Sequence, residues 1–139
     1  DVMQLNLGAC SEDDIAVAVA CPVVAKHQDR DEIVLYGGAV HLSKEYITVS
    51  DDIGNEKTKM YGYIALPEER RGWGKIVDNT YISGLSQEHG IVKTEPTFFN
   101  QVNIGDVLMV LPVHSCLTAN LLRKYLTLEG EVIALASYK

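Results

Sequence analysis

Short β-strand segments separated by turn residues are the feature that most constrains the fold of this chain. Apolar and β-branched runs recur about every 8–12 residues, and Gly, Pro, Asn or Asp residues separate them. The expected strands are residues 15–26, 32–36, 46–50, 60–66, 79–85, 91–95 and 107–110, followed by a hairpin of 125–128 and 131–136. Many short strands with this spacing predict a mainly β domain, built as a barrel or a sandwich.

Helical periodicity is scarce in the sequence. Only residues 39–44 and 117–123 have apolar spacing that favours a helix, and each segment is long enough for one or two turns. The Gly37-Gly38 pair ends an apolar run, so we expect a positive φ angle or a close backbone contact there. Residues 67–75 are rich in Gly and charge and are expected to form a loop.

Length and charge exclude some classes of function. The 139 residues contain no repeat or linker, so we expect a single domain over residues 1–139. The net charge of −7 argues against a nucleic-acid partner, because phosphate binding needs clustered Lys and Arg. No apolar run approaches the roughly 20 residues that cross a bilayer, and no signal-peptide core is present, so we expect a cytoplasmic protein without a membrane partner.

The cysteines and the first residues add two expectations. Cys10, Cys21 and Cys116 are an odd number of cysteines at unpatterned spacings, which suits reduced thiols rather than a disulfide framework. We expect Cys10 and Cys21 to be small buried apolar side chains. The chain opens at Asp1, inside a patterned segment and without a methionine, so we expect it to be part of a larger protein.

The Pro-Val-His-Ser-Cys segment at residues 112–116 is the main candidate for chemistry. If the backbone is extended there, residues two apart project from the same face, and His114 and Cys116 can reach one point. An imidazole and a thiolate together favour zinc among divalent ions. Two protein ligands would leave coordination positions open to substrate or to ligands from elsewhere. The alternative is a buried His and Cys at the end of a strand, and the spacing alone leaves both interpretations open.

The other histidines give weaker signals. Glu88-His89-Gly90 places a carboxylate beside an imidazole at a strand end, where the carboxylate can orient the ring, although a solvated loop has the same pattern. His41 follows the glycine turn and is a third candidate. His27 lies in a charged turn and is expected to be solvated.

The order of these segments resembles one family. They are Asp1-Val2-Met3-Gln4, Glu12 to Ala16, Gly37-Gly38 with Leu42-Ser43-Lys44, Gln87-Glu88-His89-Gly90, Gly105-Asp106, and Pro112-x-His114-x-Cys116-x-Thr118-x-Asn120-Leu121. Together they are similar to the C-terminal β-domain of D-serine dehydratase-like and D-threonine aldolase-like enzymes. These are fold-type III pyridoxal-phosphate proteins related to alanine racemase. The resemblance covers nearly the whole chain and implies the fold of the alanine racemase C-terminal domain.

The resemblance also implies roles for particular residues. His114 and Cys116 would bind zinc or another divalent metal beside the cofactor, and Thr118 and Asn120 would brace the metal loop through hydrogen bonds. Glu88 and His89 would lie near the mouth of the active site as catalytic candidates. Dehydratase-like members resemble this chain in having Cys at the second metal position, whereas aldolase-like members more often have Asp.

The resemblance places the cofactor outside this chain. In the family, a (β/α)8 barrel carries the Schiff-base lysine and holds the pyridoxal phosphate. We expect that barrel upstream of residue 1 and assign no cofactor-binding residue here. The residues around the Gly37-Gly38 turn also depart from the family's usual sequence, which leaves the exact substrate open.

The expected protein is therefore a lyase of which this chain is one part. It would convert a D-3-hydroxy amino acid to a 2-oxo acid and ammonia, with the metal as a Lewis acid on the β-hydroxyl. Its partners would be the substrate, its own barrel and a second subunit. The chain alone is expected to be inactive and to expose an apolar patch. The alternatives are an aldolase-like or racemase-like enzyme, and a free-standing metal-binding or interaction domain without catalysis.

Overall fold

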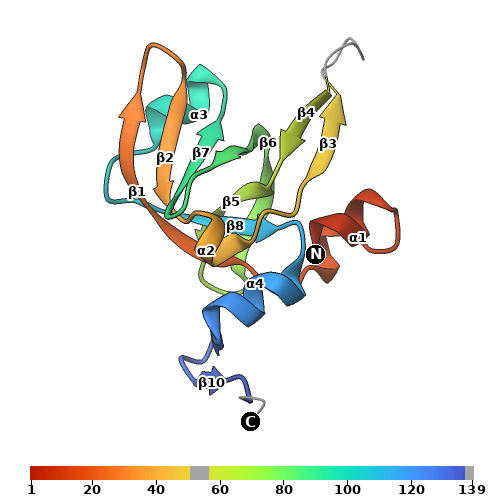
Figure 1. Ribbon diagram of the computed structural model, residues 1–139. Coiled ribbons are helices and arrows are strands. Elements are labelled where there is room, and N and C mark those ends of the chain that lie inside the picture. The colour runs from red at the N-terminus through yellow and green to blue at the C-terminus, as the bar shows by residue number, and fades with distance from the viewer. Residues whose placement is uncertain (51–56, 137–139) are drawn as a thin grey trace.

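A ring of six antiparallel strands forms the body of the domain (Figure 1). The computed structural model describes residues 1–50 and 57–136. The strands follow one another round a closed barrel in the order β1-β2-β7-β6-β5-β8, and β8 closes the ring by pairing with both β5 and β1. Their bounds are β1 Val19–His27, β2 Glu32–Tyr36, β5 Gly62–Glu68, β6 Gly72–Leu85, β7 His89–Lys93 and β8 Val107–Pro112. The prediction of a mainly β domain is confirmed.

Two small antiparallel sheets are attached to the barrel. One pairs β3 (Ile47–Ser50) with β4 (Lys57–Met60), and the other pairs β9 (Lys124–Leu126) with β10 (Val132–Ala134). The second sheet is the hairpin that the sequence predicts near the C-terminus, with shorter strands than expected.

The helices are short and fill the junctions between strands. They are α1 (Val2–Asn6), a 3-10 turn (Glu12–Asp14), α2 (Ala39–Leu42), α3 (Pro96–Gln101) and α4 (Ser115–Leu122). The sequence predicts α2 and α4, whereas α1 and α3 were not predicted. Among the residues described, no helix is both long and apolar enough to cross a membrane.

The prediction of a loop over residues 67–75 was wrong. β5 continues to Glu68 and β6 begins at Gly72, so only a tight turn separates them. The Glu68 carboxylate accepts hydrogen bonds from the backbone N–H groups of Arg70 and Arg71, at 3.3 and 3.0 Å, and Gly72 has a φ angle of 82°. The Gly and charged residues therefore build a hairpin turn, and the strands extend almost to it.

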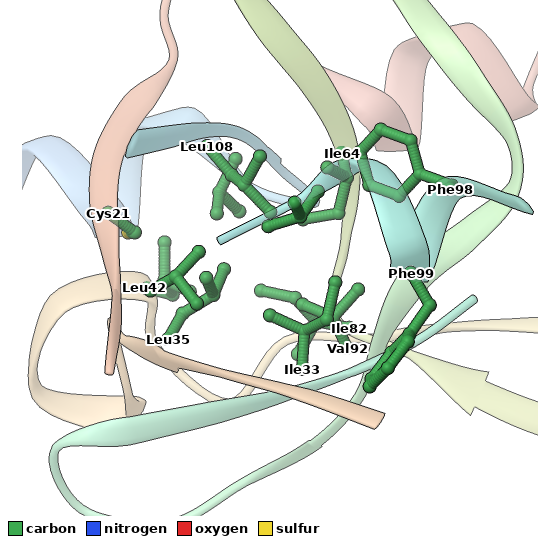
Figure 2. Close-up of a cluster of buried hydrophobic side chains, with 13 residues drawn as sticks. Cys21, Ile33, Leu35, Leu42, Ile64, Ile82, Val92, Phe98, Phe99 and Leu108 are labelled. Atoms are coloured by element: carbon green, nitrogen blue, oxygen red, sulfur yellow. The ribbon is translucent and has the colours of Figure 1, made fainter. Parts of the chain in front are cut away.

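The barrel core is built from alternate residues of the strands. In β2 and β7 every second side chain is buried, which is the period expected of strands with one face inward. Figure 2 shows Leu42 of α2 on the Cys21 and Leu35 side of this core, with Phe98 and Phe99 of α3 on the opposite side. The two short helices therefore contribute apolar side chains to different sides of the core.

A second apolar cluster joins the N-terminal helix to the end of β8. Its fully buried members include Val2 of α1, Met60 of β4 and Leu111 of β8, together with Val113 just after that strand. This cluster fixes the chain immediately before His114.

The Gly37-Gly38 turn makes the close backbone contact that the sequence allows. A Cβ atom on Gly38 would lie 2.5 Å from the carbonyl carbon of Glu88 and from the amide nitrogen of His89. A Cβ atom on Gly37 would lie 2.5 Å from the sulfur of Cys21. The Gly37 N–H donates to the Glu88 carbonyl at 2.9 Å, and Gly38 has a φ angle of −107°, so the need for glycine here is steric.

Replacement of Gly38 by alanine should destabilise the domain. The added methyl group meets backbone atoms that cannot move away as a flexible side chain would, so we expect a loss of about 1–3 kcal/mol in the free energy of unfolding. Urea denaturation measures this change in the free energy of unfolding. Gly74→Ala in β6 is the matched control, because nothing lies within 4 Å of its Cβ position. Equal stabilities of the two variants would contradict the steric argument.

Candidate metal centre

The His114-Ser115-Cys116 segment forms the junction between β8 and α4. β8 ends at Pro112, and His114 is the N-cap residue of α4, with φ −129° and ψ 98°. Cys116 is the second residue of the helix. The expectation that both residues share one extended backbone was therefore wrong, because the chain turns into a helix between them.

Both side chains are available for binding. His114 is half-buried and its imidazole makes no capping hydrogen bond to α4, although it occupies the N-cap position. Cys116 is exposed. An imidazole not used by the helix and an accessible thiol fit a borderline-soft divalent ion such as zinc. Within residues 1–50 and 57–136, no three His, Cys, Asp or Glu side chains gather into a metal cluster, so any further ligand would come from water, substrate or another part of the protein.

The other two cysteines differ from Cys116 in environment. Cys21 is buried in the barrel core, and burial raises the pKa of its thiol to about 12. A thiol in that state is unsuited to bind a metal as a thiolate at neutral pH. The prediction of a buried apolar role is confirmed for Cys21, whereas Cys10 is only half-buried.

The carboxylate of Asp1, from the other end of the sequence, holds the junction of β8 and α4. Its Oδ2 atom accepts hydrogen bonds from the backbone N–H and from the hydroxyl of Ser115, at 3.0 and 3.1 Å. Its Oδ1 atom accepts from the N–H of Gln4 at 3.2 Å and caps α1. One carboxylate thus ties the start of α1 to the start of α4. The sequence shows Asp1 only as part of the family resemblance, because the two partners are 114 residues apart.

Thr118 and Asn120 act at different places on α4. Thr118 is fully buried, and its hydroxyl donates to the carbonyl of Leu42 at 3.3 Å, which docks α4 on α2. Asn120 is exposed and accepts a hydrogen bond from the Arg123 guanidinium at 2.9 Å, near the C-terminal end of the helix. The position of Thr118 agrees with a role in bracing the metal loop, and the same role for Asn120 stays a prediction.

The Glu88-His89 segment lies on the other side of α2. Both side chains are exposed, and their backbone is the surface against which Gly38 packs. The turn at the start of α2 packs against this segment through Gly38, and α2 contacts α4 through the Leu42 carbonyl; Figure 1 shows α2 next to α4.

An aromatic and imidazole cluster accompanies this segment. The exposed ring of Tyr36 makes edge contacts with the rings of His41 and His89, at centroid distances of 5.1 and 6.0 Å. The N–H of Gly38 donates to Nδ1 of His41 at 3.2 Å, so the proton of the neutral ring lies on Nε2. His41 therefore presents a hydrogen-bond donor rather than a metal ligand. His27 is half-buried at the opposite end of β2 from α2, where it pairs with Glu32, and is remote from these residues in the sheet.

Comparison with known families identifies the domain. The model of the family described as "Putative serine dehydratase domain" matches residues 16–128. The chain belongs to this family. The sequence resemblance to D-serine dehydratase-like proteins is thereby confirmed.

The similar proteins include characterised dehydratases and one protein of unassigned activity. The chain is 24% identical over 137 residues to the D-threo-3-hydroxyaspartate dehydratase of Delftia sp. strain HT23, with 94% of this chain and 33% of that enzyme covered. It is 26% identical over 134 residues to the D-serine dehydratase of Schizosaccharomyces pombe, with 94% and 28% covered. It thus spans about a third of the length of these relatives. An uncharacterized protein of Mycobacterium bovis is 32% identical over 126 residues, with 87% and 79% covered.

Solved structures share the fold. An alanine racemase-like protein from Idiomarina loihiensis superposes with a TM-score of 0.75 at 24% identity, covering 96% of this chain and 34% of that one. The Delftia dehydratase gives a TM-score of 0.76 at 22% identity, covering 99% and 37%. Two further structures of a D-threo-3-hydroxyaspartate dehydratase carry alanine in place of a cysteine, or of the histidine two positions before it, and the cysteine variant is in a metal-free form.

The three thiols should differ in their rate of alkylation. At pH 8 in the folded protein, iodoacetamide should modify exposed Cys116 first and half-buried Cys10 more slowly, and should leave Cys21 unmodified. The Cys21 thiol is inaccessible and, with a pKa of about 12, almost fully protonated. Peptide mass spectrometry over time measures the order. In urea the three rates should converge, and equal rates for Cys21 and Cys116 without urea would contradict the burial of Cys21.

Proposed function

We propose that this chain is the metal-bearing domain of a lyase that converts a D-3-hydroxy amino acid to a 2-oxo acid and ammonia. The observation that carries the proposal is the His-x-Cys pair at an accessible strand-to-helix junction of a serine dehydratase family domain. The sequence contains one such pair, His114 and Cys116. Its spacing equals that of the two residues replaced in the D-threo-3-hydroxyaspartate dehydratase variants, one of which is metal-free.

The residues of this chain would hold and orient the metal. His114 and Cys116 provide an imidazole and a thiolate, and the remaining positions stay open to water, substrate or another part of the protein. When bound, zinc supplies Lewis acidity at the substrate's β-hydroxyl. Thr118 holds α4 against α2 through its hydrogen bond to Leu42. The Glu88 carboxylate and the His89 imidazole, whose backbone packs against Gly38, are the candidates for proton transfer.

The rest of the machinery would lie outside the chain. Because the chain spans about a third of the dehydratases it resembles, we propose that pyridoxal phosphate is held by a (β/α)8 barrel in the same protein and that the protein is a homodimer. An apolar groove of about 860 Å³ lies between the segment before β1 and the β9–β10 hairpin. It supports the proposal that another domain packs against this one. Leu126, Leu128 and Val132 on this hairpin are 72%, 60% and 62% exposed, which is the apolar surface expected from the sequence.

The free cysteines also suit the cytoplasm. All three cysteines are free thiols. A reducing compartment maintains thiols in this state, so we propose a cytoplasmic location.

A second candidate function rests on the mycobacterial relative. This domain accounts for 79% of that protein, so the family includes a chain with little beyond the domain itself. In that setting the domain would bind a metal or a partner without catalysis. Aldolase-like or racemase-like chemistry is less favoured, because a cysteine at the second metal position matches the dehydratase-like pattern and prefers zinc.

Loss of either metal ligand should remove both metal and activity. In the full-length protein, His114→Ala and Cys116→Ala should each reduce bound zinc to a small fraction of one ion per subunit. Turnover of D-serine or D-threonine should fall by about a hundredfold or more, because the Lewis acid is lost. Elemental analysis and detection of the 2-oxo acid are the measurements.

His27→Ala is the control, because His27 lies at the far end of β2. It should keep both zinc and turnover. Glycine and an aldehyde as products would identify an aldolase instead. Unchanged zinc content in both ligand variants would show that His114 and Cys116 do not bind the metal.

A further inference from the structure

The α4 N-terminus is capped by a residue other than its own N-cap side chain. His114 occupies the N-cap position, where a side chain normally accepts from the first N–H groups of the helix, yet its imidazole makes no such bond. The Asp1 carboxylate instead caps the helix by accepting a hydrogen bond from the N–H of Ser115. Because capping falls to Asp1, the imidazole of His114 remains available for another ligand.

We propose that Asp1 is a positioning residue for the metal site at His114 and Cys116. This inference rests on the proposed function of that site. Asp1 grips Ser115, the residue between the two ligands, by both its N–H and its hydroxyl. Two bonds to one residue fix the turn of the backbone at the point that sets the separation of imidazole and thiol. When this separation is already fixed, less conformational entropy is lost on metal binding, and the affinity for the metal is higher.

The charge of Asp1 supports the same role. The carboxylate is half-buried and hydrogen-bonded to Ser115, the residue between the two proposed ligands. A negative charge beside a cation favours binding, and partial burial reduces the screening by water. Asp14 of the 3-10 turn directs its carboxylate to Ser11 and not to the proposed ligands.

The Asp14 and Ser11 pair provides a matched control within the same chain. Oδ2 of Asp14 accepts from the N–H and from the hydroxyl of Ser11, at 2.8 and 2.7 Å. This is the same pattern of bonds that Asp1 makes with Ser115, at a short helical turn that carries no metal-site residue. A purely structural role would give similar consequences when either aspartate is changed.

The test measures the affinity of the full-length protein for Co²⁺, through the thiolate-to-cobalt charge-transfer absorption. Asp1→Asn should weaken Co²⁺ binding by about 10- to 100-fold, the range seen when residues that orient metal ligands are changed. Ser115→Ala removes one of the two bonds and should give a smaller loss. Asp14→Asn and Ser11→Ala should stay within about twofold of the unchanged protein, and Asp1→Glu should recover part of the affinity.

The outcomes separate this inference from the proposed function. If His114→Ala and Cys116→Ala abolish the absorption but Asp1→Asn binds Co²⁺ as tightly as Asp14→Asn, only the role of Asp1 is overturned. If the two ligand variants bind Co²⁺ unchanged, the metal site itself is overturned and the role of Asp1 with it. Thermal unfolding of Asp1→Asn and Asp14→Asn checks that both variants are folded. Should Asp1→Asn fail to fold, Ser115→Ala against Ser11→Ala decides the question.

Discussion

The contact of the Gly37-Gly38 backbone with the loop that leads into β7 is the constraint on which the candidate site depends. No side chain fits between Gly38 and the backbone of Glu88 and His89, so β2 turns directly into α2 at this point. That turn seats Leu42 in the barrel core and directs its carbonyl to Thr118. The position of α4, and with it of Cys116, follows from a contact that only glycine permits.

The junction of β8 and α4, which carries the candidate metal ligands, is held from both of its sides. Thr118 ties the first turns of α4 to α2 through a buried bond, and Asp1 ties its start to α1. The apolar cluster around Val113 fixes the end of β8 just before the turn. The imidazole and thiol project from a support made by three separate parts of the chain, while they themselves remain accessible. Rigid support with accessible donors is the arrangement that a metal site with open positions needs.

Family membership and chain length together shape the functional proposal. The domain belongs to the serine dehydratase domain family and has the fold of alanine racemase-like proteins, while it spans about a third of the characterised dehydratases. The proposed division of labour gives the metal to this domain and pyridoxal phosphate to another. The alignment covers 79% of the mycobacterial relative, so the behaviour of this domain with little else attached can be studied in that protein.

The sequence by itself predicted the mainly β class, most strands and a special backbone arrangement at Gly37-Gly38, and it singled out His114 and Cys116 as candidate metal ligands. These signals are local, because a two-residue period and the lack of a side chain can be read within a few residues. Only the tertiary structure decided that β5 and β6 form one hairpin, that Cys116 lies in the first turn of α4, and that Asp1 reaches Ser115. The folded barrel brings Asp1 and Ser115 into contact although they are 114 positions apart in the sequence. No local sequence pattern encodes which distant groups will meet.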